Sequence, residues 1–352
     1  MSDYSKQIDA DNERKINKLL NAMPQFCKLY FDDAKRAKQT RTRLGYARDI
    51  KRFFDWLQST AGYKHINLLS STVSILDHLT FEDFEEYKKN IEFSNKTDSK
   101  GNNFLTENTT MARRLSALRS FMKFYYSIGM IKNNPAMFIS MPKVFEKNII
   151  TLNQNEVDTI LDAITSNVGL TPNQIKRRKL TEKRDIAIMF TLLGTGIRVS
   201  ELVGLDVDSI DFHNARILIT LKGGNEGYAY FGENVENALR DYIDNGRDIL
   251  SPSDKALFIS TKQQRMTVRS IELLVKDYAK RSGIPDADKI TPHKLRATYG
   301  TNLYKQSGDI RLVASSLHHK SVETTSKHYV VDSEEHQQKV IDYSSNLFNK
   351  DS

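Results

Sequence analysis

The stretch from Thr291 to Arg296, TPHKLR, constrains this chain more than any other. Thr291 is a favoured N-cap residue and Pro292 suits the first helical position, so a helix is predicted to begin here. His293 then lies in the first turn, where backbone N–H groups and the helix dipole favour an anion. Arg296 follows three residues later on the same face. A cationic pair held at a helix N-terminus predicts a phosphate-binding site.

A second arginine has a similar setting upstream. The apolar run from Ile186 to Leu193 predicts a buried helix, and Gly194-Thr195-Gly196 lets the chain turn sharply after it. The next residues, 197–202, read as the start of another helix. Arg198 would therefore lie at a helix opening, again beside free N–H groups.

A β-hairpin is predicted after this helix. Residues 216–221 and 228–231 have strand character, and Lys222-Gly223-Gly224-Asn225 between them is a turn. Lys222 would project from the tip. A third strand is predicted at 256–259.

The order of six residues, with the segments around them, resembles the active-site set of the tyrosine recombinase family, also called phage-type integrases. GTGIRVSELVGLDVDSID (194–211) is similar to the first conserved box of that family, and TPHKLRATYGTNLY (291–304) and LHHKSVETTSKHYV (317–330) to the second. The resemblance spans roughly residues 153–331. His318 stands where the family usually has glycine. The six residues are Arg198, Lys222, His293, Arg296, His319 and Tyr329.

The resemblance implies a mainly α fold with a small antiparallel β-sheet in the C-terminal domain, and a site-specific recombinase activity. Tyr329 would attack a DNA phosphodiester and form a 3′-phosphotyrosine, which preserves the bond energy for religation. Arg198 and Arg296 would hold the non-bridging oxygens, and Lys222 would protonate the leaving 5′-oxygen. His293 and His319 would assist proton transfer.

Two local alternatives remain open at this point. Lys262 or another loop lysine is an alternative to Lys222. His318, His319 and His328 suggest a metal site, but adjacent histidines on a turn point apart, and no cysteine or carboxylate completes the set. No cofactor or metal is therefore expected.

Five segments are predicted along the chain. They are an N-terminal polar arm (1–23), a helical core-binding domain (24–140), an extended linker (141–150), a catalytic domain (151–332) and a C-terminal tail (333–352). Val340, Ile341, Leu347 and Phe348 give the tail apolar character. By analogy with the family, we expect the tail to be exchanged between subunits.

Basic side chains between the apolar positions of the first domain predict contacts with DNA phosphates, although a solvated helix face is the alternative. The candidates are Arg41, Arg43, Arg48, Lys51, Arg113, Arg114 and Arg119. The resemblance further implies double-stranded DNA as the partner. It also implies a homotetramer on two recombination sites, or an assembly with a related recombinase, and neither a membrane nor a small-molecule substrate.

Composition agrees with this interpretation without establishing it. Lys and Arg number 52 against 44 Asp and Glu, so the net charge of +8 is only a mild preference for nucleic acid. With Cys27 as the single cysteine, an intrachain disulfide is excluded, and the N-terminal residues lack the apolar segment of a signal peptide. A cytoplasmic location is expected.

Two other functions compete with the recombinase. One is a type IB topoisomerase-like DNA-relaxing enzyme, and the other is a DNA-binding protein that has lost catalysis. The complete set of candidate residues argues against the second. Chromosome dimer resolution and integration or excision of a mobile element remain equally open as biological roles.

Overall fold

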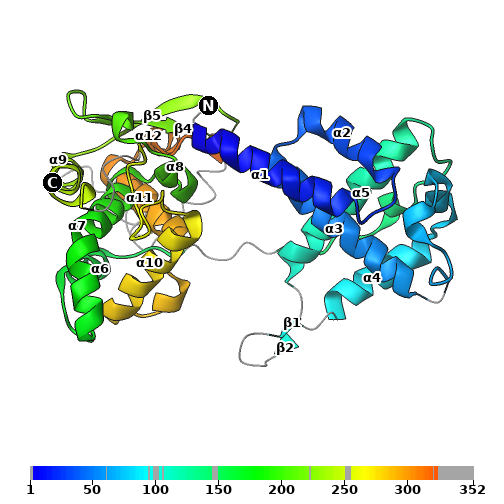
Figure 1. Ribbon diagram of the computed structural model, residues 1–352, viewed down its shortest axis with the longest axis horizontal. Helices are drawn as coiled ribbons and strands as arrows, with labels where there is room; N and C mark the ends of the chain where they lie inside the picture. The colour runs from blue at the N-terminus through cyan, green and yellow to red at the C-terminus, as the bar shows by residue number, and fades with distance from the viewer. Residues whose placement is uncertain are drawn as a thin grey trace, which may run out of the picture. The chain divides into compact units, whose positions relative to one another are not determined.

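The computed structural model describes residues 3–60, 62–93, 96–97, 103–104, 107–144, 150–221, 223–249, 255–319 and 321–323. The chain forms two compact units, one spanning Asp3–Lys147 and one that begins at Asn148 (Figure 1). Lys222, Tyr329 and the tail 333–352 lie outside the described residues. No helix in the described part of the chain is long and apolar enough to cross a membrane.

Five α-helices lie in the described part of the N-terminal unit. They are α1 (Asp3–Leu20), α2 (Cys27–Ala37), α3 (Thr40–Ser59), α4 (Phe81–Phe93) and α5 (Asn108–Ser127). The same described residues include the 3₁₀ turns η1 (Leu68–Ser70), η2 (Val73–His78) and η3 (Pro135–Phe138), and a pair of two-residue strands, β1 (Lys96–Thr97) and β2 (Asn103–Phe104). The two strands form a short antiparallel pairing, with Lys96 opposite Phe104 and Thr97 opposite Asn103.

The core of this unit is aromatic. The rings of Phe53 on α3 and Phe84 on α4 stack with centroids 5.5 Å apart, and Tyr125 on α5 is fully buried. Ile16 and Leu20 of α1 are buried in the same core. The predicted polar arm is therefore largely a helix that packs on α3, because two apolar residues one turn apart give it a buried edge.

The second unit carries the helices α6 to α12. They are α6 (Gln154–Thr165), α7 (Pro172–Thr195), α8 (Val199–Val203), α9 (Glu233–Tyr242), α10 (Val268–Ser282), α11 (Pro292–Ser307) and α12 (Ile310–Ser316). Short turns are η4 (Val207–Ser209), the π-helical η5 (Ile243–Arg247) and η6 (Ala287–Lys289). The strands are β3 (Ile210–Asp211), β4 (Arg216–Thr220) and β5 (Glu226–Tyr230). Helix α11 packs against α7 and α12 (Figure 1).

The sheet has the antiparallel order β3-β4-β5, so its third strand differs from the predicted one. Residues 256–259 are buried but make only two isolated bridges, from Ala256 to Asp206 and from Ile259 to Arg265. The apolar residues 256–259, which predicted a strand, are apolar because they are buried and not because they form a ladder of strand hydrogen bonds. The partner in the sheet is the two-residue β3, which is too short to have a sequence period.

Helix α7 is longer than predicted. The basic run 176–179 precedes the predicted apolar stretch but lies inside the same helix, because Thr171 and Gln174 form a capping box and Pro172 follows at N1. Arg178 in this run is buried and donates to the carbonyl of Ile164 at 2.7 Å.

Candidate active site

The site begins where α7 ends. Gly196 is the C-cap of α7 with φ of +62°, in the left-handed region that glycine adopts without strain. A Cβ on Gly196 would lie 2.4 Å from Cδ1 of Tyr299 and 2.9 Å from Cδ2 of Leu317. Only glycine therefore fits both the turn and the close approach of α11 and α12.

Arg198 is the N-cap residue of α8, two residues after this turn. Its backbone N–H donates to Oε2 of Glu201 at 2.7 Å, and its Nη1 donates to Oε1 of the same carboxylate at 2.7 Å. Glu201 is buried, whereas the Arg198 side chain is 34% exposed. The buried carboxylate thus orients the guanidinium from its protein side and leaves the guanidinium accessible from solvent.

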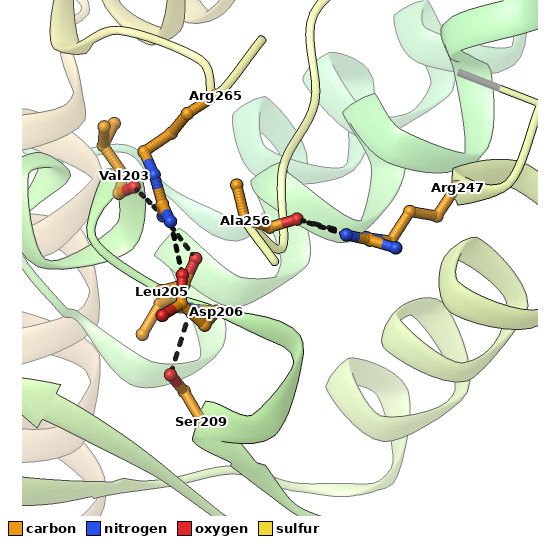
Figure 2. A network of polar contacts seen from close by, with 7 residues as sticks. All are labelled: Val203, Leu205, Asp206, Ser209, Arg247, Ala256 and Arg265. Atoms are coloured by element: carbon orange, nitrogen blue, oxygen red, sulfur yellow. Dashed lines mark hydrogen bonds and ion pairs between the residues drawn. The ribbon is translucent and has the colours of Figure 1, made fainter. Parts of the chain in front are cut away.

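Helix α8 is also fixed at its other end (Figure 2). Arg265 donates to the carbonyls of Val203 at 3.0 Å and Leu205 at 2.7 Å, and it forms an ion pair with Asp206. These contacts satisfy carbonyls at the C-terminal end of a five-residue helix. Arg198 is therefore mounted on a short element that is held at both ends.

Arg296 is buried, with 4% of its surface exposed, and connects three segments. Its Nη1 donates to the carbonyl of Gly196 at 2.6 Å, and its Nη2 donates to the carbonyl of Leu317. Both carbonyls lie at C-terminal ends of helices, where the helix dipole favours a cation. One guanidinium therefore brings the segments of Arg198, Arg296 and His319 together.

Helix α12 ends in a Schellman motif that sets the position of His319. The N–H of His319 donates to the carbonyl of Ala314 at 2.9 Å, and the N–H of His318 donates to that of Ser315 at 3.0 Å. His318 takes the left-handed position with φ of +49°. This is the conformation that explains a glycine preference here, and His319 follows directly after it.

The structure places His293 in the first turn of α11, exposed, as predicted from the sequence. Thr291 is the N-cap by position, but its side chain makes no capping hydrogen bond. The predicted hairpin is present as β4 and β5, and Gly223 and Gly224 in its turn both have positive φ. Lys222 of that turn and Tyr329 lie outside the described residues.

Glu201 was not among the residues predicted from the sequence. The signal that identifies it is an acidic residue three positions after an arginine at a helix start, which places a carboxylate over the first turn. Because many exposed carboxylates share this spacing, only the burial of Glu201 shows that it positions Arg198.

Four of the predicted DNA contacts are engaged inside the N-terminal unit. Arg43 is buried in an ion pair with Glu13, and Arg113 pairs with the fully buried Asp49. Arg119 donates to the carbonyls of Ala136, Met137 and Ile139. Arg114 is buried, and burial lowers the pKa of its guanidinium. These contacts give Arg43, Arg113 and Arg119 roles in holding the unit together.

The other three predicted DNA contacts lie on α3. Arg41 and Arg48 are exposed. Lys51 is half-buried and binds Asp55 of the same helix at 2.7 Å. Exposed guanidiniums on one helix are suited to phosphate contacts.

Comparison with known proteins places the chain in a family. The sequence profile of the Phage integrase family matches residues 151–336, more than half of the chain. The tyrosine recombinase XerC of Thermodesulfovibrio yellowstonii is 33% identical over 229 residues, which cover 64% of this chain and 72% of the relative. The tyrosine recombinase XerD of Yersinia pestis is 31% identical over 219 residues, covering 62% and 69%.

Solved structures show the same fold. The XerH site-specific recombinase in a post-cleavage complex with palindromic difH substrate aligns with a TM-score of 0.64 at 16% identity, covering 88% of this chain and 82% of that chain. The Tn1549 transposon integrase (residues 82–397) with circular intermediate DNA gives 0.60 at 19% identity, covering 90% and 98%. The chain therefore belongs to the phage integrase family and is a tyrosine-type site-specific recombinase, an enzyme that cleaves and rejoins DNA.

Proposed function

We propose that Tyr329 is the nucleophile and that its phenol oxygen forms a 3′-phosphotyrosine. The bond from phosphorus to the 5′-oxygen breaks as the new bond forms, and Lys222 gives a proton to the departing oxygen. Rejoining runs the same steps backwards with a 5′-hydroxyl from another strand. The observation that carries this proposal is the buried guanidinium of Arg296, which joins the end of α7 to the end of α12.

Arg198 and Arg296 stabilise the charge that develops on the non-bridging oxygens. The Glu201 contacts fix Arg198 and the two carbonyls fix Arg296, so neither guanidinium has to reorganise during the reaction. His293 in the first turn of α11 and His319 after α12 act in proton transfer and bind the phosphate. Charge stabilisation is thus supplied by side chains of the chain itself.

The N-terminal unit contacts the DNA backbone through α3. Arg41 and Arg48, both exposed, are the first candidates, and Lys51 can contribute if it releases Asp55. Each phosphate contact that is lost should weaken binding to all sequences alike and reduce its salt dependence. Arg41→Ala and Arg48→Ala test this in a salt titration of DNA affinity.

The working assembly is a homotetramer on two recombination sites, or a mixed tetramer with a related recombinase. The tail 333–352 docks on the next subunit through its apolar residues, which are too few for a core of their own. A chain that ends after Asp332 should bind one half-site normally but lose cooperative binding to two. Cooperative assembly and normal recombination by the truncated chain would contradict this role.

The biological role is either chromosome dimer resolution or movement of a mobile element. The structures that share the fold of this chain include a site-specific recombinase bound to difH substrate and a transposon integrase bound to circular intermediate DNA. Mapping the selected DNA site in the host genome distinguishes the two roles, because a single chromosomal site supports resolution and a site at element ends supports mobility.

The catalytic assignment is tested by comparing cleavage with binding. Arg198→Ala and Arg296→Lys should each slow single-turnover cleavage by about 10²–10³ while DNA affinity changes little, because their contacts strengthen in the transition state. Arg311→Ala, on the exposed start of α12, is the control. Equal losses of affinity and of cleavage rate would show that the arginines only anchor the phosphate.

A further inference from the structure

Helix α8, whose N-cap is Arg198, is too short to hold its own orientation. Its five residues span about 7.5 Å, and isolated helices shorter than about 12 residues are marginal in water. Leu202 and Val203 are buried, which keeps the helix on the core. Because the burial of apolar side chains is non-directional, it does not fix the direction in which the helix points.

The contact between Glu201 and Arg198 does not fix that direction either. The two residues are the N3 and N-cap positions of the same helix, so the carboxylate orients the guanidinium relative to α8 alone. Arg296 of α11 holds the chain before α8, through the carbonyl of Gly196. The C-terminal end of α8 therefore needs a contact of its own.

Arg265 makes this contact (Figure 2). Its Nη1 donates to the carbonyls of Val203 at 3.0 Å and Leu205 at 2.7 Å. Its Nη2 pairs with the carboxylate of Asp206, and the Arg265 side chain is only 19% exposed. The planar guanidinium presents its donors in fixed directions, so it can orient the end of a helix as the single ammonium of a lysine cannot.

The backbone of Arg265 is itself well supported. Arg265 forms an isolated β-bridge with Ile259, and the N–H of Met266 donates to the carbonyl of Phe258 at 3.0 Å. Thr267, two residues after Arg265, is the N-cap of the 15-residue helix α10. Arg265 therefore connects the end of a short helix to the start of a long one.

The chain that follows α8 stays paired without Arg265. The N–H of Leu257 donates to the carbonyl of Leu205 at 2.9 Å, and the N–H of Val207 donates to that of Lys255 at 2.9 Å. A carbonyl oxygen has two lone pairs, so Leu205 accepts from Leu257 and Arg265 together. Loss of the guanidinium therefore frees the end of α8 and leaves the next segment in place.

We propose that Arg265 is a positioning residue for DNA cleavage, which aims Arg198 at the phosphate by holding the C-terminal end of α8. This inference rests on the role proposed above for Arg198. Without the contact, the short helix shifts and carries Arg198 with it. Since a misplacement of about 1 Å can cost about 10² in rate, a smaller shift should slow cleavage about tenfold and change DNA affinity little.

A double-mutant cycle of Arg265→Lys with Arg198→Ala tests the proposal. Lysine keeps the positive charge beside Asp206 but loses the fork that reaches both carbonyls. Single-turnover cleavage is measured at saturating protein, so that DNA affinity does not enter the rate. Arg269→Lys is the matched control, because Arg269 makes an exposed pair with Glu272 in the first turn of α10.

The cycle separates positioning from a general loss of structure. We expect Arg265→Lys to cleave about tenfold slowly and Arg198→Ala about 10²–10³ slowly. The double variant should be no slower than Arg198→Ala, because Arg265 acts through Arg198 and has nothing to aim once that side chain is gone. Arg269→Lys should cleave like the wild type.

Three results would overturn the proposal. The first is wild-type cleavage by Arg265→Lys, and the second is a tenfold loss that persists in the Arg198→Ala background. Arg265→Gln, whose amide can still donate to one carbonyl, replaces Arg265→Lys in the cycle if the lysine variant does not fold. The third is failure of both variants to fold, which would assign Arg265 to the fold alone. Wild-type cleavage by Arg198→Ala would instead refute the role of Arg198, and that single variant shows it independently.

Discussion

Glu201 binds Arg198 at two points, through the backbone N–H and through the guanidinium, each at 2.7 Å. The carboxylate is buried, and the guanidinium that it holds is partly exposed. Glu201 therefore fixes both the start of α8 and the direction of the Arg198 side chain.

Glu201→Gln should weaken catalysis more than folding. The amide keeps the size of the side chain but loses the charge that orients Arg198, and a hydrogen bond to a charged group contributes about 1.5–3 kcal/mol. If that loss falls on the transition state, single-turnover cleavage slows about ten- to a hundredfold. Glu236→Gln, which affects an exposed pair with Arg240 on α9, is the control. Unchanged cleavage by Glu201→Gln would show that Arg198 needs no orientation.

Gly196→Ala should destabilise the second unit strongly. The new Cβ meets Tyr299 and Leu317 at 2.4 and 2.9 Å in addition to the left-handed φ, and the two effects together predict about 3 kcal/mol. Gly283→Ala has the same backbone penalty, with φ of +71°, but no described atom within 4 Å, so about 1 kcal/mol is expected. Calorimetric melting of the two variants measures the difference, and equal losses would mean that packing around Gly196 adjusts freely.

Asp49→Asn should destabilise the N-terminal unit by about 1.5–3 kcal/mol, because it weakens a hydrogen bond between charged groups whose acceptor is buried while the Arg113 side chain is partly exposed. Asp49 on α3 is fully buried and pairs with Arg113 on α5, so the contact ties two core helices. Asp55→Asn removes a largely exposed pair with Lys51 and should cost less than about 0.5 kcal/mol. Trp56, the only tryptophan, packs on this core and reports urea unfolding of the unit. A similar urea midpoint for the Asp49→Asn and Asp55→Asn variants would contradict the larger contribution that we assign to the contact between Asp49 and Arg113.

The stability of the second unit should decrease as pH falls below about 6.5. Burial lowers the pKa of His318 from its ordinary value of 6.5, and Arg296 and Arg198 lower it further, while Glu201 and the Tyr228 carbonyl partly offset this. The unfolded chain then binds a proton that the folded chain does not, so the contribution is complete above 6.5 and is lost below it. His318→Asn should melt with a weaker pH dependence between pH 7.5 and 5.5, and parallel curves would rule out this titration.

The sequence predicted those parts of the site that depend on local signals. Pro292 begins α11 as expected, and the hairpin strands lie within two residues of their predicted ends, because capping and turn chemistry act over a few residues. The family resemblance supplied the order of the catalytic residues, and the comparisons confirmed the family.

The remaining features depend on contacts between distant segments. Arg296 donates to the carbonyl of Gly196, which is 100 residues away along the chain, and no pattern in the sequence around either residue predicts this hydrogen bond. In the sequence, Arg43 and Arg114 cannot be told from the exposed basic residues beside them. Both are buried, since tertiary packing decides which face of a helix is covered. Likewise, the strand-like residues 256–259 pair through isolated bridges.

The central claim is that Tyr329 carries the cleaved DNA strand. The protein is incubated with a duplex that is selected for binding and carries a nick close to the cleavage site. Cleavage then releases a short strand with a free 5′-hydroxyl, which diffuses away, so that the covalent complex accumulates. After protease digestion, mass spectrometry locates the nucleotide adduct. We predict one adducted peptide, with the 3′-phosphate on Tyr329, and none from Tyr329→Phe despite normal DNA binding. An adduct on another residue, or one that persists in Tyr329→Phe, would contradict the account.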